Sequence, residues 1–61
     1  MKVRDAIKLI EQGGWKLKRT RGDHRVYTHT TKPGIVVVPG HLESDVATGT
    51  LSSILKQAGL K

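Results

Sequence analysis

No cysteine occurs in this chain of 61 residues, so neither a disulfide nor a thiolate-bound metal can supplement its core. A chain of this length buries only roughly 60% of the surface that its unfolded form exposes. The fold must therefore rest on packing and backbone hydrogen bonds. We expect a single domain over residues 1–61, with no room for a deep cofactor pocket.

Apolar residues recur at helical spacing near both ends of the chain. In the first segment these residues are Val3, Ala6, Ile7 and Ile10, which predicts a helix over about residues 2–12 that ends at the pair Gly13-Gly14. The last segment repeats the spacing with Leu51, Ile54, Leu55 and Ala58. This predicts a second helix ended by Gly59, with Thr48 or Thr50 as its N-cap. Capping at this helix start also explains Ser52 and Ser53.

Three β-prone stretches separate the two helices. Trp15 and Leu17 alternate with lysines, a turn pair Gly22-Asp23 leads into residues 25–28, and a further turn over residues 31–34 precedes the run 35–38. The order α-β-β-β-α predicts an α+β fold, in which a three-stranded antiparallel sheet carries two helices on one face. The third strand, which is the most β-prone, is expected to be central or best buried. Strand parity leaves open whether Val26 or Tyr27 faces the helices. We expect Tyr27, the larger apolar side chain, to do so, which places His24 on the open face.

Positive charge is concentrated in one segment. Eleven Lys and Arg stand against five Asp and Glu, and five of the cations fall within residues 16–25. This density favours a polyanionic partner, nucleic acid above all. A membrane surface is less suitable, because neither helix opposes a cationic face to a Trp, Phe or Leu face. No apolar run approaches the length of a membrane span and the amino terminus lacks signal-peptide features, so a cytoplasmic location is expected.

His24 is the candidate catalytic residue. It follows the predicted turn and is flanked by Arg21 and Arg25, which could bind the phosphates on either side of a scissile bond. Cleavage of RNA by its own 2′-hydroxyl requires only a proton acceptor, a proton donor and positive charge. Neither a metal nor a small-molecule cofactor is needed for this chemistry. The alternative interpretation is that His24 is a polar residue at an exposed strand start.

The other two histidines are weaker candidates. His29, five residues after His24, points to the opposite side of a regular strand and is expected to be a structural hydrogen-bonding group. His41 lies in a predicted loop, and nothing in its neighbourhood orients it. No HxH, HxxxH or HExxH spacing indicates a metal site. The two aromatic residues, Trp15 and Tyr27, are expected in the core rather than as a platform for stacked bases.

Three blocks of the sequence carry a resemblance to a known family. They are VRDAIKLIEQGGWKLKRTRGDHRVYTH, TKPGIVVVPGH and GTLSSILKQAGL, and together they resemble the HicA family of small bacterial toxins over essentially the whole chain. The resemblance implies a fold like the double-stranded RNA-binding domain, metal-free cleavage of messenger RNA, and a HicB antitoxin as protein partner.

The resemblance also assigns roles to residues. The Gly-Ser-His-Arg block of that family falls on Gly22, Asp23, His24 and Arg25, so His24 inherits the catalytic role. Asp23 replaces the usual serine, where it either orients His24 or repels phosphate. Thr30 and Thr48 replace residues that are often proline in the family. The expected RNA-binding residues are Lys16, Lys18, Arg21, Gly22 and Arg25.

Two other functions remain as alternatives to a ribonuclease. The first is a non-catalytic RNA-binding module with the fold of the double-stranded RNA-binding domain. Such domains carry a lysine cluster at the start of the second helix, whereas here no lysine follows Thr50 until Lys56. The second is a degenerate toxin that binds its antitoxin but has no activity. DNA binding is weaker still, because no helix-turn-helix spacing is present.

Overall fold

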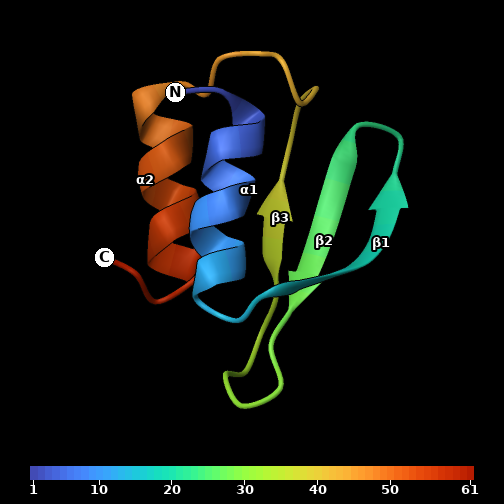
Figure 1. Ribbon diagram of the computed structural model, residues 1–61, viewed down its shortest axis with the longest axis vertical. Helices are drawn as coiled ribbons and strands as arrows, with labels where there is room; N and C mark the ends of the chain where they lie inside the picture. Colours follow the sequence, from blue (N-terminus) through green and yellow to red (C-terminus); the bar gives the residue numbers. More distant parts are fainter.

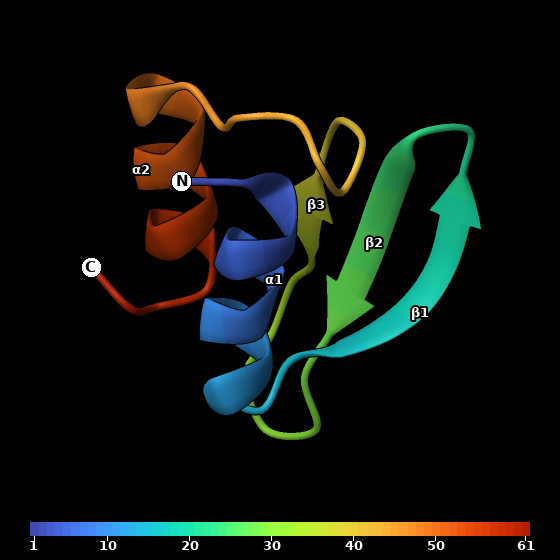
Figure 2. The same cartoon turned by 45° about the horizontal axis from the view of Figure 1, so that its top comes forward.

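The computed structural model describes all residues 1–61 and confirms the predicted α+β order. The elements are α1 (Val3–Gln12), β1 (Lys16–Arg21), β2 (His24–Thr28), β3 (Val36–Val38) and α2 (Thr48–Gln57). Two antiparallel pairings join the strands into one sheet in the order β1-β2-β3. The two helices lie side by side, with β3 nearest to them and β1 farthest away (Figures 1 and 2).

The core lies between the helices and one face of the sheet. The side chains that Tyr27, Val36 and Val38 direct to this face are buried with the apolar faces of both helices, which confirms the expected orientation of Tyr27. Trp15 is also fully packed here, as predicted. The complete cluster consists of Val3, Ile7, Ile10, Trp15, Tyr27, Val36, Val38, Ile54 and Ala58.

The third strand is the best buried but is not central. β2 occupies the centre because each strand pairs with its neighbour in sequence. Val36 and Val38 are nonetheless fully buried, since the helices lie over this side of the sheet. The outer edge of β3 is partly closed by α2, where the Gln57 Oε1 atom accepts a hydrogen bond from the Val37 N–H at 3.4 Å. A helix side chain thus replaces the missing fourth strand at this position.

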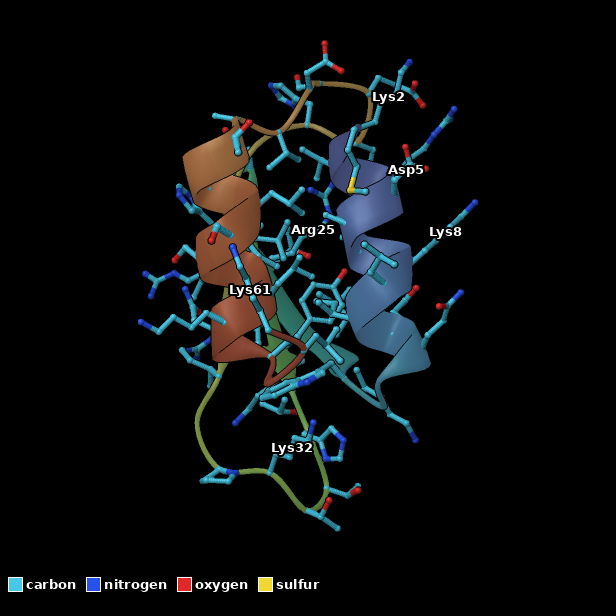
Figure 3. All side chains as sticks on the ribbon, turned by 90° about the vertical axis from the view of Figure 1, so that its left-hand side faces the viewer. Lys2, Asp5, Lys8, Arg25, Lys32 and Lys61 are labelled. Carbon is cyan, nitrogen blue, oxygen red and sulfur yellow. The ribbon has the colours of Figure 1, made fainter.

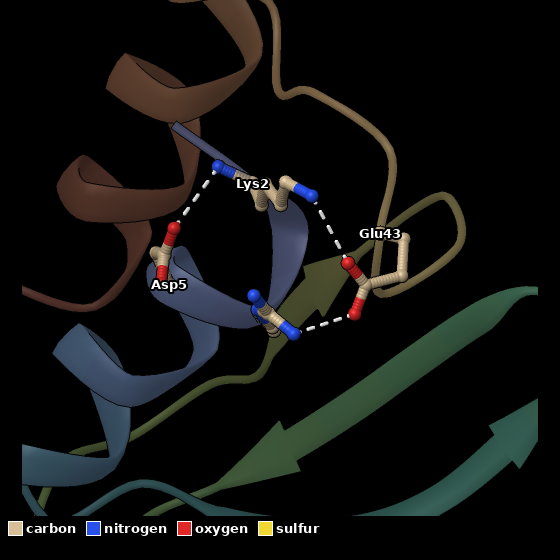
Figure 4. A network of polar contacts seen from close by, with 4 residues as sticks. Lys2, Asp5 and Glu43 are labelled. Atoms are coloured by element: carbon tan, nitrogen blue, oxygen red, sulfur yellow. Dashed lines mark hydrogen bonds and ion pairs between the residues drawn. The ribbon is translucent and has the colours of Figure 1, made fainter.

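The two helices begin differently. At α1, the Lys2 backbone N–H donates to the Asp5 carboxylate at 3.2 Å, as in one half of a capping box. Glu43 forms ion pairs with Lys2 and Arg4 and ties the long loop to this helix (Figure 4). At α2, Ala47 is the N-cap and supplies no side-chain bond. The expected Thr48 or Thr50 cap is therefore wrong.

The position of the α2 start has a backbone cause. The Val46 N–H donates to the Met1 carbonyl at 2.8 Å, and the Val3 N–H donates to the Ser44 carbonyl at 2.9 Å. These bonds hold the end of the loop extended against the amino terminus. Ala47 is consequently the last extended residue, and Thr48 is already helical.

His29 is a structural residue, as predicted. Its Nε2 lies 2.9 Å from the Gly13 carbonyl, and its Nδ1 accepts hydrogen bonds from the backbone N–H groups of Thr31 and Lys32. Because a carbonyl only accepts, the ring proton must be on Nε2. Gly14, at φ +95°, has no room for a side chain, since a Cβ atom would lie 2.6 Å from that nitrogen. His29 therefore joins the end of α1 to the chain that leaves β2.

Candidate active site

The strand register decides which side chains share a face with His24. Residues paired across antiparallel strands point to the same side of the sheet, and neighbours along a strand alternate. Arg21 pairs with His24, Arg19 with Val26, and Lys16 with Thr28. Since Tyr27 faces the core, these three pairs lie on the open face. His24 is thus brought together with the cations Lys16, Arg19 and Arg21, all of which are exposed.

A β-bulge in β1 makes this arrangement possible. The register shifts between Leu17 and Arg19, so that Lys18 has no partner in β2. In a regular strand Lys16 and Arg21 would point to opposite faces, whereas the extra residue brings them to the same one. The sequence pattern points to Lys16, Lys18 and Arg21 but not to Arg19. No residue pattern in β1 reveals the bulge, because charged side chains occupy both faces.

The position of Arg25 differs from the one expected from the sequence. Arg21 and Arg25 flank His24 along the chain, but Arg25 lies on the opposite face of β2, as the alternation of a strand requires. Its guanidinium donates to the Gly40 carbonyl at 3.0 Å and is partly buried. In the view of Figure 3 this side chain is seen through the gap between the two helices, on the side of the sheet that they cover. Arg25 therefore joins β2 to the loop after β3 and does not flank His24 in space.

The imidazole of His24 is accessible and has one charged neighbour. Its side chain is 57% exposed, and its Nδ1 lies 3.2 Å from the Asp23 Oδ1 atom. Because a carboxylate only accepts, this neighbour favours the tautomer with the proton on Nδ1. The Nε2 atom is then free to take a proton from a bound molecule. Asp23 is placed to orient His24.

The hairpin turn that carries His24 is tight. Arg21 and His24 close a two-residue loop, and Gly22 adopts φ +59°. A positive φ at this first loop position is a requirement of type II′ turns, which glycine meets without strain. Nothing lies within 4 Å of the position that a Cβ atom of Gly22 would occupy. The backbone of the turn is therefore open to a large ligand beside His24.

A groove joins His24 to the second helix. Its volume is about 360 Å³, near the lower end of small-molecule sites at about 300–1,000 Å³. The sheet side of the groove is formed by His24, Val37 and Pro39, and α2 supplies Gly49, Thr50, Ser53, Ile54 and Gln57. The sequence does not reveal the helix side, because capping of this helix is a sufficient explanation for its serines. Only the tertiary structure places Ser53 opposite His24.

Two other titratable residues are remote from this chemistry. His41 is exposed in the loop after β3 and does not line the groove. Tyr27 faces the core, where desolvation by burial raises the pKa of its phenol, with a smaller contribution of the same sign from Glu11. A phenol with a raised pKa is a poor proton donor at neutral pH. Neither residue therefore competes with His24 as a candidate for proton transfer at this groove.

One protein family matches almost the whole chain. The model of a family described as the HicA toxin of bacterial toxin–antitoxin systems matches residues 3–60. A search of curated proteins gives no significant match. Neither helix of the structure is long and apolar enough to cross a membrane.

Proposed function

Since this chain belongs to the HicA family of toxins of bacterial toxin–antitoxin systems, we propose that it is an endoribonuclease that cleaves messenger RNA and uses His24 for proton transfer. The observation that carries this proposal is the position of His24. Its free imidazole nitrogen is exposed on the same face of the sheet as three cations, with Asp23 against the other nitrogen. This combination supplies a proton-transfer group and positive charge where a phosphodiester can bind.

The proposed reaction uses the substrate as its own nucleophile. The ribose 2′-oxygen forms a bond to the neighbouring phosphorus, and the bond from phosphorus to the 5′-oxygen of the next nucleotide breaks. The products are a 2′,3′-cyclic phosphate and a 5′-hydroxyl end. As general base, the Nε2 of His24 takes the proton of the 2′-hydroxyl; as general acid, the protonated ring gives one to the departing 5′-oxygen. The reaction as written needs no metal.

The cations have a separate role in this proposal. Arg21, the partner of His24 in the hairpin, is the cation nearest in register to the imidazole, and Arg19 and Lys16 continue along the same face. Guanidinium groups bind phosphate through paired hydrogen bonds. We assign Arg21 to the scissile phosphate, where it stabilises the negative charge of the transition state. Arg19, Lys16 and the bulged Lys18 hold the phosphates that follow, and the Gly22 backbone allows close approach.

A toxin of this family has an antitoxin partner. We propose that the partner is of the HicB type and that it silences the toxin by covering the basic face around His24. Complementary charge across such an interface favours an acidic partner surface. The toxin acts in the cytoplasm in this proposal, where both messenger RNA and a co-expressed antitoxin are present.

The test compares two histidine variants. His24→Ala is expected to reduce cleavage of a purified messenger RNA by about 10²- to 10⁴-fold, the usual contribution of general acid–base catalysis, and to abolish growth arrest when the chain is induced in a bacterial host. Its thermal unfolding should match that of the wild type, because His24 is exposed. His41→Ala removes a histidine that lies outside the groove, and it should cleave RNA normally.

Three results would contradict the proposal. A His24→Ala protein that still arrests growth and cleaves RNA would exclude His24 as the catalytic residue. If His24→Ala and His41→Ala lost RNA cleavage to the same extent, the loss would be due to the removal of any histidine and would not be specific to His24. If the wild type binds RNA but cuts none, the chain is a non-catalytic RNA-binding module, and Asp23→Ser is the first reversion to make.

A further inference from the structure

We propose that the groove between His24 and α2 is a base-recognition subsite, which binds the base of one nucleotide next to the scissile bond and prefers guanine or uracil over adenine or cytosine. This inference rests on the proposed function, because it concerns the RNA that His24 would cleave. His24 forms one wall of the groove, and Ser53 and Gln57 of α2 form the other. A base in the groove therefore belongs to a nucleotide that adjoins the reacting phosphate.

The orientation of the Gln57 side chain is determined by its partners. Its Oε1 atom faces the backbone N–H of Val37 at 3.4 Å, and its Nε2 atom lies 3.1 Å from the Ser53 Oγ. Because a backbone N–H can only donate, the oxygen of the carboxamide must be on that side. The NH₂ group then points along α2 towards Ser53. One of its two hydrogens is used by Ser53, and the other is available to a ligand.

Ser53 completes the donor set. Its hydroxyl oxygen accepts the hydrogen bond from Gln57, so its own hydrogen is free to be donated. Ser53 is exposed, and a ligand in the groove can therefore accept this hydrogen. The helix side of the groove thus presents two hydrogen-bond donors, one from Ser53 and one from Gln57, while the carboxamide oxygen of Gln57 is directed at the Val37 N–H.

Two donors discriminate between bases by a simple rule. Guanine and uracil have a carbonyl oxygen where adenine and cytosine have an amino group. A carbonyl accepts hydrogen bonds from both donors, whereas an amino group brings a third donor and leaves polar groups unpaired. The groove should therefore select bases by their keto group, whether the base is a purine or a pyrimidine.

The remaining walls suit the flat face of a base. Val37, Pro39 and Ile54 line the groove with apolar atoms. The two aromatic side chains, Trp15 and Tyr27, are each only 2% exposed and cannot stack on a base. Binding therefore depends on aliphatic packing and on the two donors. Specificity should be moderate, because the loss of one neutral hydrogen bond changes affinity only about fivefold.

The first experiment measures binding without cleavage. The wild-type protein is titrated by NMR with 2′-O-methyl trinucleotides that differ only in the central base, so that no 2′-hydroxyl can attack. With central guanine or uracil we expect the largest shifts at the Val37 backbone amide, the Ser53 amide and the Gln57 side-chain NH₂. With adenine or cytosine these shifts should be smaller and require about fivefold more ligand, as the loss of one hydrogen bond predicts.

Three outcomes would overturn the inference, and they are distinguishable. Shifts confined to Arg19 and Arg21 would mean that RNA binds the basic face while its bases avoid the groove, which leaves the proposed function intact. Absence of shifts at both surfaces would mean that the chain does not bind RNA, which removes the proposed function and this inference together. Equal shifts with all four bases would reject the keto preference.

The second experiment changes the donors and compares cleavage-site sequences. Ser53→Ala removes one donor and should weaken the preference for keto bases about fivefold, whereas Ser52→Ala makes the same change at a serine that instead contacts Lys61. Gln57→Glu keeps an acceptor for Val37 but replaces groove donors by acceptors, so the preference should move towards adenine and cytosine. Gln12→Glu adds the same charge at the far end of α1. Unchanged cleavage sites in both groove variants would reject the subsite.

Discussion

The structure helps to choose between the two roles that the sequence leaves open for Asp23. On sequence grounds it could orient His24 or repel phosphate, and its carboxylate is found 3.2 Å from the Nδ1 of that ring. We therefore expect Asp23 to act as a positioning residue. Both side chains are about half exposed, so this contact is weaker than the buried aspartate–histidine pair of serine proteases, where the change to asparagine costs about 10⁴-fold.

We predict that Asp23→Asn lowers the rate of RNA cleavage by roughly tenfold, well below the effect in a buried triad. An amide no longer favours the proton on Nδ1, so the ring spends more time in the tautomer that cannot accept a proton through Nε2. The ¹⁵N shifts of the His24 ring measure this tautomer directly. Asp45→Asn, at an exposed loop position, removes the same charge and should change neither quantity. Faster cleavage by Asp23→Asn would show instead that the carboxylate repels phosphate.

At the scale of the elements, the β1–β2 hairpin carries the charged residues, whereas α2 contributes both to the core and to the groove. β1 is exposed along its whole length and is joined to the molecule through its pairing with β2. It can therefore carry charge with little effect on the core. α2 contributes Ile54 to the core, next to its C-cap Ala58, and also gives Ser53 and Gln57 to the groove. Changes on this helix must be made on its polar side alone.

We predict opposite effects for arginines on the two faces of the sheet. Arg19→Gln with Arg21→Gln should weaken RNA binding and reduce the slope of log affinity against log salt by roughly 1.4, as expected for two lost phosphate contacts on single-stranded RNA. The free energy of unfolding should change by less than about 0.5 kcal/mol, because both residues are exposed.

Arg25→Gln is the matched comparison, since it removes one positive charge from the neighbouring position of the hairpin. Here the hydrogen bond to the Gly40 carbonyl is lost, so stability should fall by about 1 kcal/mol. The salt slope of RNA binding should stay near that of the wild type. Denaturant unfolding and filter binding at several salt concentrations measure both quantities. If Arg25→Gln strongly changed the slope of log affinity against log salt, Arg25 would have to be counted as an RNA-binding residue.

The whole molecule separates its charges. Of the five acidic residues, Glu43 pairs with Lys2 and Arg4 at the start of α1, and Asp5 accepts from the backbone of that helix start. Asp23 is the acidic residue of the hairpin. The four cations of β1, Lys16, Lys18, Arg19 and Arg21, stand against Asp23 alone, so this strand and its turn carry +3, which is half of the net charge of +6. This is the surface that both RNA and an acidic antitoxin would recognise.

We predict that RNA and antitoxin compete for this face. In a complex with a HicB-type antitoxin, hydrogen exchange should slow at the Gly22 and His24 amides. Arg19→Gln with Arg21→Gln should weaken antitoxin binding as well as RNA binding. Isothermal titration and hydrogen-exchange mass spectrometry test the two effects. Protection confined to the outer surfaces of α1 and α2, with His24 still exposed, would exclude steric masking as the way the toxin is silenced.

Much of this architecture follows from local sequence patterns. The 3.6-residue spacing of apolar positions located both helices to within one or two residues, and the run at 35–38 located β3. The size of Tyr27 predicted that it faces the core, and alternation along β2 then placed His24 on the other face. These properties depend on neighbours along the chain. For that reason one sequence was sufficient to identify the strand that carries the candidate catalytic residue.

Other features required contacts between distant segments. The bulge that aligns Lys16 with Arg21 depends on pairing between β1 and β2, and the Ala47 cap depends on bonds to the amino terminus. The same alternation that located His24 also moves Arg25 to the opposite face, where a carbonyl 15 residues away binds it. The groove is formed only when α2 packs beside β3. Local periodicity thus determined which residues belong to each element, whereas tertiary packing decided which of them meet around His24, because side chains remote in sequence are brought together only by the burial of the shared core.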